Sequence, residues 1–197
     1  TNASATSANG SQHIIVTWTD NASDENEYHV ERSNDGSTGW SDISGALPAN
    51  TTSYDDNVGA WSTTRYYRVR ALKTSSGDYS NYTSVVSATT APAAPTIGAV
   101  TPADDSNVLS VSWTDNSSDE TTFSIEASAD GSTGWSAVAT DPATPYGHDV
   151  GARDTTRYYR MRAFRSSDGR YSSYSGTSSA AITAPANSTN IAVSIVD

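Results

Sequence analysis

Cysteine is absent from this chain of 197 residues, and basic residues are scarce. Without cysteine the protein forms no disulfide and uses no thiolate chemistry, so redox usage does not indicate a compartment. The 11 Lys and Arg residues are outnumbered by 22 Asp and Glu residues, which gives a formal net charge of -11 at pH 7. Because this charge repels phosphate backbones and anionic lipids, we expect no nucleic-acid partner.

Long hydrophobic runs are also absent. The longest aliphatic-rich run is IAVSIV at 191–196, whereas a helix needs about 20 apolar residues to span a bilayer. We therefore expect no membrane insertion. The hydrophobic fraction of 35% is low but sufficient for packed cores in one large or two small domains.

A long internal repeat is present instead. TTRYYRVRA begins at position 63 and returns as TTRYYRMRA at position 155, and the stretch 19–43 returns as 114–138. The two copies are 92 and 95 residues apart at these points. A repeat of this length indicates a duplicated domain rather than a solenoid of short units.

Proline marks the limits of the two copies. Pro92 and Pro95 lie between them in APAAPTIG, and TAPA at 183–186 closes the second copy. Proline is excluded from central strands and favours extended linkers. We therefore expect a first domain, a second domain and a tail strand, at residues 1–91, 92–185 and 186–197 respectively.

Within each copy, apolar residues alternate with polar ones. A period of two predicts antiparallel strands with one buried face, and Asx-Gly turns at 35–36 and 130–131 separate neighbouring strands. The fold class expected is all-β, with two seven-stranded sandwiches and an extra C-terminal strand. The side chains expected in the two cores are Trp18, Tyr28, Val30, Tyr67, Val69, Trp113, Phe123, Ile125, Tyr159 and Met161.

The repeated phrase TTRYYRVRA reads as a strand with two different faces. We expect Tyr67 and Val69 on its core face, and Tyr66, Arg68 and Arg70 as a Tyr/Arg stripe on its outer face. Arginine stems can cover apolar surface there while their charged ends pair with carboxylates. The phrase occurs twice because each sandwich needs this strand.

The two copies resemble fibronectin type III domains of the kind found in bacterial and archaeal secreted proteins. The matching phrases are IIVTWTDNASDENEYHVERSNDG, TRYYRVRA and GDYSNY in the first copy, and LSVSWTDNSSDETTFSIEASADG, TRYYRMRA and GRYSSY in the second. The resemblance implies two consecutive immunoglobulin-like sandwiches and an extracellular or cell-surface location. It specifies function weakly, because the family serves mostly as spacers and interaction surfaces.

The residues that the two copies share do not form a recognisable catalytic set. The three histidines, His13, His29 and His148, have no counterpart in the other copy and no metal-ligand spacing. We expect surface or loop histidines without a chemical role. The sequence thus predicts no catalytic residue, no cofactor, no metal site and no enzymatic activity.

A repeated acidic phrase leaves two interpretations open. It reads Asp20, Asn21, Asp24 and Glu25 in the first copy, and Asp115, Asn116, Asp119 and Glu120 in the second. Its oxygens could bind calcium, but the spacing is not that of an established calcium loop. The favoured interpretation is that short Asx side chains cap the turn between two strands.

Three tryptophans outside the alternating strands are candidates for sugar stacking. Trp40 and Trp135 each follow a GSTG turn, and packing over the edge of the core is the favoured interpretation for both. Trp61 has no aromatic counterpart in the second copy, and we expect it to be the more exposed. Candidate glycosylation sequons begin at Asn2, Asn9, Asn21, Asn50, Asn81, Asn116 and Asn187.

The end of the chain carries a strand that the repeats do not account for. Ile191, Val193 and Ile195 share one face of this segment, whereas the first copy opens with small alanines such as Ala3 and Ala5. In one interpretation the tail starts a third repeat or folds back on the second domain. In the other it pairs with the first domain of another copy and produces head-to-tail polymers.

The function expected from these observations is structural. The chain reads as a subunit of an extracellular filament or adhesive fibre, whose partners are other copies of itself and, as a further candidate, a carbohydrate or cell-surface ligand. Two alternatives remain open. One is a spacer in a secreted polysaccharide-degrading enzyme, and the other is a fibre or decoration module of a phage virion.

Overall fold

The computed structural model describes residues 2–186. The predicted tail-strand residues Ile191, Val193 and Ile195 lie outside the described residues, as does the sequon residue Asn187. The chain divides into two compact units. Within the described residues, the first comprises 2–93, 117–121 and 164–173, and the second comprises 94–116, 122–163 and 174–186. The domain limits at 91 and 185 stay a prediction.

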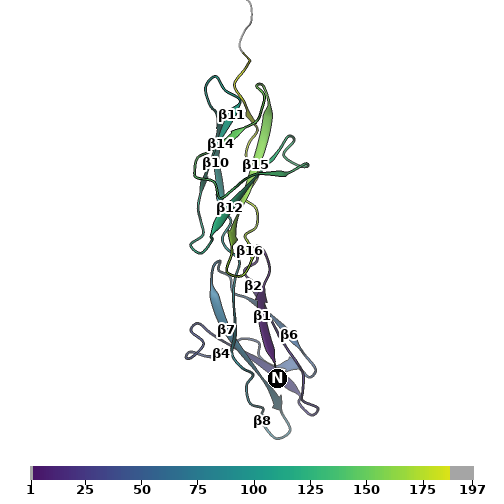
Figure 1. Cartoon of the computed structure of the whole chain (residues 1–197). Coiled ribbons are helices and arrows are strands. Elements are labelled where there is room, and N and C mark those ends of the chain that lie inside the picture. The colour runs from purple at the N-terminus through teal and green to yellow at the C-terminus, as the bar shows by residue number, and fades with distance from the viewer. Residues whose placement is uncertain (1, 187–197) are drawn as a thin grey trace, which may run out of the picture. The chain divides into compact units, whose positions relative to one another are not determined.

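The first copy of the repeat folds into nine short strands (Figure 1). They are β1 (Ala3–Ser7), β2 (His13–Trp18), β3 (Glu27–Ser33), β4 (Ser41–Asp42), β5 (Leu47–Pro48), β6 (Ser53–Asn57), β7 (Thr64–Lys73), β8 (Asp78–Tyr79) and β9 (Val86–Thr89).

These strands occupy seven positions in two sheets. One sheet has the order β1-β2-β6, and the other has the order β4-β3-β7-β8. β5 pairs with the other end of β3, and β9 pairs with the other end of β7, so each of these two edge positions is filled by two pieces. The seven-stranded sandwich expected from the alternation is therefore confirmed.

The core of the first sandwich lies between these sheets. All five side chains predicted for it are buried, and Tyr67 at its centre has 0% exposure. The burial pattern of β7 alternates as predicted, with Arg68 and Arg70 on the outer face. Period-two alternation was sufficient here because each strand turns one face toward the opposite sheet and the other toward solvent.

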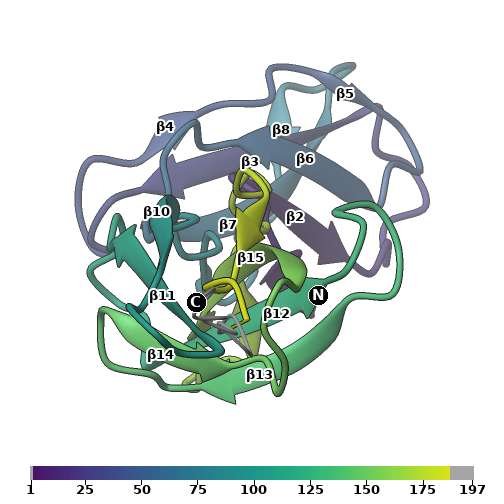
Figure 2. The ribbon, with the colours of Figure 1, turned by 90° about the horizontal axis from the view of Figure 1, so that it is seen from above.

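The second copy folds into eight strands with the same arrangement. They are β10 (Thr96–Pro102), β11 (Val108–Thr114), β12 (Thr122–Ser128), β13 (Ser136–Thr140), β14 (Tyr146–Asp149), β15 (Thr156–Arg165), β16 (Arg170–Tyr171) and β17 (Ala181–Ile182). One sheet has the order β10-β11-β14, seen from above in Figure 2, and the other has the order β13-β12-β15-β16, with β17 pairing β15.

The core of the second sandwich corrects two of the predictions. Ile125, Tyr159 and Met161 are fully buried as expected. Trp113 and Phe123 are only half-buried and pack against the edge of the core. Phe123 lacks the hydroxyl through which Tyr28, its counterpart, donates a hydrogen bond to Asp20.

Part of each sandwich edge is built by hydroxyl side chains instead of a regular strand. After β8, the amides of Ala71 and Val69 donate to Ser80 Oγ (2.9 Å) and Thr83 Oγ1 (3.1 Å). In the second copy, the amides of Met161 and Tyr159 donate in the same way to two serines spaced three residues apart. The hydroxyls thus satisfy main-chain donors where β pairing is interrupted.

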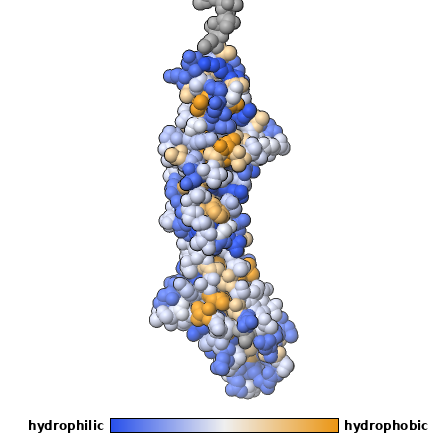
Figure 3. Space-filling model, in the orientation of Figure 1, coloured by the Kyte–Doolittle hydropathy of each residue, from blue (hydrophilic) through white to orange (hydrophobic). Residues whose placement is uncertain are grey.

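Within residues 2–186, no helix is long and apolar enough to cross a membrane. On the face drawn in Figure 3, polar colours predominate and apolar residues form small, separate spots. Among the described residues, the large apolar side chains that are exposed are Ile15, Tyr79, Val85 and Ile182.

Candidate functional site

The outer face of the first sandwich carries a stack of arginine and aromatic side chains. The guanidinium of Arg68 lies 4.4 Å from the ring centroid of Trp40 and 3.8 Å from that of Tyr82. Arg70 lies 3.8 Å from the ring centroid of Tyr79. Glu31 on β3 accepts from Arg68 Nη2 at 2.6 Å. Each cation is therefore held by ring faces and by a carboxylate together.

Glu31 is held ionised by these partners. Burial alone would raise the pKa of Glu31, but hydrogen bonds from the Tyr82 hydroxyl and from Arg68 keep it below its ordinary value. The Tyr82 hydroxyl donates to the second carboxylate oxygen. The carboxylate has no proton to donate near neutral pH, and it serves as an anchor for the stack.

The second sandwich repeats the same stack with different residue numbers. Arg160 lies 4.4 Å from the ring centroid of Trp135 and 4.0 Å from that of Tyr174. Its Nη2 atom pairs with Glu126 at 2.7 Å, and the Tyr174 hydroxyl donates to the same carboxylate at 2.7 Å. The arginines of TTRYYRVRA and TTRYYRMRA thus take part in one stack in each sandwich.

This geometry bears on the candidate sugar platforms. Trp40 and Trp135 are half-buried, and an arginine lies over a ring face of each. The arrangement favours the packing interpretation, because that ring face is occupied within the chain. Trp61 is also half-buried, so the expectation that it would be more exposed than the other two finds no support.

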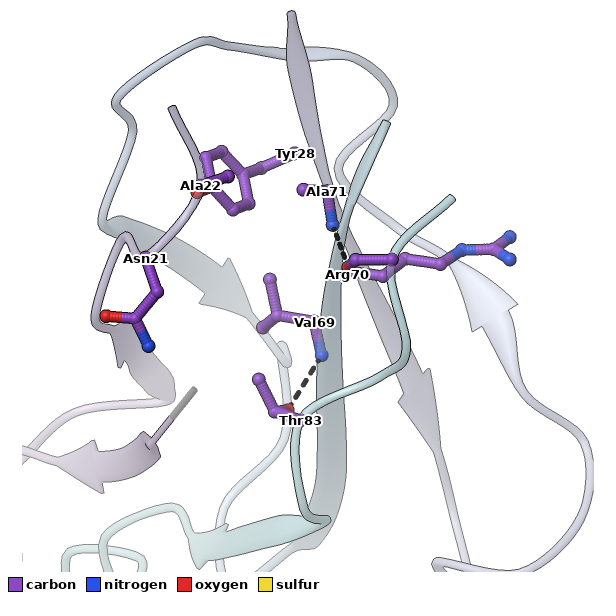
Figure 4. Close-up of a pocket in the computed structure, with 8 residues that line it drawn as sticks. Asn21, Ala22, Tyr28, Val69, Arg70, Ala71 and Thr83 are labelled. Atoms are coloured by element: carbon purple, nitrogen blue, oxygen red, sulfur yellow. Dashed lines mark hydrogen bonds between the residues drawn. The ribbon is translucent and has the colours of Figure 1, made fainter. Parts of the chain in front are cut away.

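A small pocket opens in the first sandwich beside β7 (Figure 4). Its volume is about 180 Å³, and its walls include Tyr28, Val69 and Thr83. Asn21 lies on the opposite wall, and the Arg70 side chain extends away from the others (Figure 4). Burial first, and then the hydrogen bond to Asp20, raise the pKa of Tyr28 well above its ordinary range. The pocket has room for a small apolar group and contains no carboxylate or histidine.

The central tyrosine of the first sandwich meets a buried ion pair. The Tyr67 hydroxyl donates to Asp56 Oδ2 at 2.7 Å, and Arg32 Nη1 donates to both oxygens of Asp56 at 3.0 Å. Burial, followed by the bond to Asp56, raises the pKa of Tyr67 far above its usual range. This network is structural, since the Asp56 side chain is only 7% exposed.

The histidines occupy three different environments. His13 Nδ1 pairs with Asp55 at 2.8 Å, and His29 Nδ1 pairs with Asp42 at 2.6 Å, both on the outside of a sheet. The expectation of surface histidines is corrected for two of the three. The His29 side chain is only 13% exposed, and His148 is half-buried with its Nδ1 2.8 Å from the Tyr159 hydroxyl.

The acidic phrase makes turn contacts in the first copy. Asp20 Oδ1 accepts from the amide of Ala22 at 3.0 Å and from the Tyr28 hydroxyl. Asp24 pairs with Lys73 at 2.6 Å. In the part of the chain that the structure describes, no group of three or more His, Asp or Glu side chains is placed to hold a metal ion. These contacts favour turn capping over calcium binding.

A groove runs along the first strand of the first sandwich. It has a volume of about 210 Å³, and its lining includes Ala5 and Ser7 of β1 and Ser87 and Ala88 of β9. β1 is the edge of its sheet, and β9 is an edge piece of the other sheet. Asp168 and Arg170 also line it, so the groove lies along the free sides of both strands in the described chain and is bordered by this charged pair.

Six of the seven sequons lie within the described residues, and all six asparagines are exposed. They differ in their contacts. Asn116 Nδ2 donates to the Ala94 carbonyl at 2.9 Å and to Thr96 Oγ1 at 2.8 Å. A glycan on Asn116 would replace one of these hydrogens, so this site is less suited to modification than an exposed amide such as that of Asn21.

Comparison with known proteins gives matches among solved structures only. No family model matches the sequence, and no curated protein matches it. The FN1–FN3 domains of chicken CNTN1 are 20% identical over 92% of this chain and 67% of that chain, with a TM-score of 0.46. The two-domain fibronectin type III segment of chicken tenascin is 13% identical over 84% of this chain and 90% of that one, with a TM-score of 0.43.

A third solved structure is similar over most of its length. The chicken interferon gamma receptor alpha chain is 14% identical over 90% of this chain and 95% of that chain, with a TM-score of 0.45. The two consecutive sandwiches of this chain are established by its own strand order. Similarity at this level concerns the fold and says nothing of partners or ligands.

Proposed function

We propose that this chain is a non-enzymatic, extracellular structural protein that assembles head to tail into a filament or adhesive fibre. Residues 191–196 of one copy would pair with β1 in the first sandwich of the next copy. The observation that carries the proposal is the groove along β1, together with an alternating apolar tail that neither repeat uses.

The second sandwich shows what the first one lacks at this position. In β1, Ala3 pairs with Trp18 and Ala5 pairs with Val16. At the same register in the second sandwich, Ile97 pairs with Trp113, and Val100 pairs with Val111. The first sandwich therefore carries two methyl groups where the second carries two branched side chains, which leaves apolar volume to be filled from outside.

The tail has the chemistry to fill this volume. Ile191, Val193 and Ile195 share one strand face. Burying three such side chains contributes roughly 1.5–3 kcal/mol each before the cost of ordering the segment. Main-chain hydrogen bonds to an edge strand would add to this. Donor and acceptor are different surfaces, so the contact propagates instead of closing into a dimer.

The experiment compares the full chain with a version that ends at Pro185. Size-exclusion chromatography with light scattering and negative-stain microscopy should show polymers for the full chain and monomers for the shorter one. A matched control keeps the length and replaces the three tail residues, Ile191, Val193 and Ile195, by serine. It should also stay monomeric, because it retains the main chain but not the apolar face.

Equal behaviour of all three versions, each monomeric at high concentration, would leave the spacer role in a larger secreted protein as the better account. Polymers that persist without the tail would also exclude strand donation. A carbohydrate or cell-surface ligand and glycosylation of the exposed sequons remain additional proposals, which glycan-array binding and mass spectrometry of the native material would test.

A further inference from the structure

The second sandwich contains a polar cavity that has no counterpart in the described pockets of the first. Its volume is about 280 Å³, and it opens beside β14 between the two sheets. Ala127, Ser136, His148 and Arg157 are among its lining residues. A cavity of this size exceeds the space of a few water molecules, each about 30 Å³ in the liquid.

The cavity arises because two residues of the repeat differ together. β6 places Asp56 opposite Ile14, and β14 places His148 opposite Leu109, which is the residue equivalent to Ile14. Ala127 occupies the position of Arg32 in the same repeat frame. The ion pair that fills this place in the first sandwich is thus replaced by an imidazole and a methyl group, and the volume of the arginine side chain is left open.

The described residues that line the cavity include one arginine and no carboxylate. Arg157 is the counterpart of Arg65, which also donates to the carbonyl of the residue before it. In the first sandwich the carboxylate of Asp56 is the acceptor for the Tyr67 hydroxyl and for Arg32. In the second, no ion pair links Arg157 to a carboxylate among residues 2–186, and its Nη1 atom donates to the Thr156 carbonyl at 2.8 Å. The carboxylate of Asp149, next to His148 in sequence, accepts from Asn107 and from the amide of Gly151.

His148 is fixed in place by aromatic rings. Its ring stacks on Tyr146 with centroids 6.4 Å apart, and it meets the Tyr159 ring edge-on at 5.7 Å. His148 Nδ1 and the Tyr159 hydroxyl share a hydrogen bond at 2.8 Å. The groups that face this histidine are Arg157, Asp149 and the two tyrosines.

We propose that this cavity binds a small carboxylate in the volume that the Arg32 side chain fills in the first sandwich. Arg157 supplies the charge, His148 supplies an imidazole nitrogen, and the methyl group at Ala127 leaves the room. A carboxylate here would pair with Arg157, which has no carboxylate partner among residues 2–186. The source is either a free carboxylate ion or an acidic side chain of another protein.

The test uses the full chain and nuclear magnetic resonance. Sodium acetate is added to the protein while sodium chloride is reduced to keep the ionic strength constant, and sodium chloride alone is the control. N-acetylaspartate amide is titrated separately as a model of an acidic side chain. We expect saturable shifts of the Ala127 methyl and His148 ring signals with carboxylate but not with chloride. The pKa of His148 should rise in the complex, while His13 and His29 serve as internal controls.

Two variants separate volume from charge. Ala127→Leu fills the cavity and Arg157→Gln removes its cation, and each should weaken saturation at least tenfold. Arg65→Gln, the matched change in the first sandwich, should leave it unchanged. Saturation that is equal in all variants, equal with chloride, or absent for both carboxylates would overturn the proposal. If Ala127→Leu does not fold, comparing carboxylate saturation in Arg157→Gln with that in Arg65→Gln still tests the proposal.

Discussion

The two sandwiches use the same strand but anchor its central tyrosine differently. Tyr67 donates to a carboxylate that also holds Arg32, whereas Tyr159 meets the neutral ring of His148. Both members of the ion pair are absent from the second sandwich. Removing only one would leave a buried charge without a partner, which is far less favourable than replacing the pair.

A second difference lies at the end of each core. Trp18 and Tyr28 are 5% and 3% exposed, with ring centroids 5.6 Å apart. Their counterparts Trp113 and Phe123 are half-buried, and their centroids are 6.1 Å apart. The Tyr28 hydroxyl and its partner Asp20 are present at the more buried end in the first sandwich. Phe123, at the less buried end in the second, has no hydroxyl.

The largest expected effect separates the two tyrosine anchors. Asp56→Ala leaves Arg32 and the Tyr67 hydroxyl without their acceptor, and we expect a loss of about 3–5 kcal/mol of unfolding free energy in the first sandwich. His148→Ala removes one neutral hydrogen bond, and we expect a loss of about 1–2 kcal/mol in the second. Urea unfolding followed through resolved amide signals of each sandwich measures both.

Equal losses for these two variants would contradict the distinction between a charged and a neutral anchor. The double variant Arg32→Ala with Asp56→His gives the first sandwich the residues of the second, and it should cost less than Asp56→Ala alone.

The arginine–aromatic stack should respond alike in both sandwiches. Arg68→Ala and Arg160→Ala each remove a cation from between two rings and from a carboxylate, and we expect a loss of about 1–2 kcal/mol for either change. The same unfolding experiment applies. Losses that differ by more than about 1 kcal/mol would show that the two stacks are not equivalent.

Tyr28→Phe should make the Trp18–Tyr28 end of the first core less stable and less tightly packed. This variant keeps the ring and removes the hydroxyl that donates to Asp20. We expect a loss of about 1 kcal/mol of unfolding free energy. Tryptophan emission should shift toward longer wavelength as Trp18 becomes more accessible. An unchanged stability and spectrum would show that the hydroxyl does not hold this end closed.

The smallest effect concerns pH. Burial first, and the charge of Arg157 second, lower the pKa of His148 below its ordinary value of 6.5. Its contribution to stability is therefore full above about pH 6.5 and is lost as the pH falls toward the lower folded-state pKa. Just below pH 6.5 the second sandwich should lose stability that a His148→Gln variant retains. Parallel pH profiles for the two proteins would contradict this.

Alternation along the chain predicted most of the fold, because each strand has one face in a core and one in water. It did not predict that Trp113 and Phe123 would be half-buried, because they alternate along their strands as Trp18 and Tyr28 do. The segments after β8 and β16, whose Ser and Thr hydroxyls accept from main-chain amides, show neither a strand period nor a helix period. Those amides lie on β7 and β15, so the spacing within each segment does not predict the hydrogen bonds.

The candidate sites show the same limit. Sequence placed Arg68 on an outer face, but the position of Trp40 above it follows from sheet pairing. The cavity at His148 is visible in the sequence only after both copies are aligned and the pair Arg32 and Asp56 is known to touch. The role of the tail remains a prediction, because it rests on a match between the sequence pattern and the groove along β1.

A mixing experiment tests the proposed assembly most directly. One partner keeps its tail and carries Ala3→Ile and Ala5→Val, which give β1 the branched side chains of the second sandwich. The other partner ends at Pro185 and keeps the native groove. Each alone should be monomeric, and an equimolar mixture should give a one-to-one dimer by light scattering. A mixture that stays monomeric, or a first partner that polymerises alone, would contradict donation of the tail strand to β1.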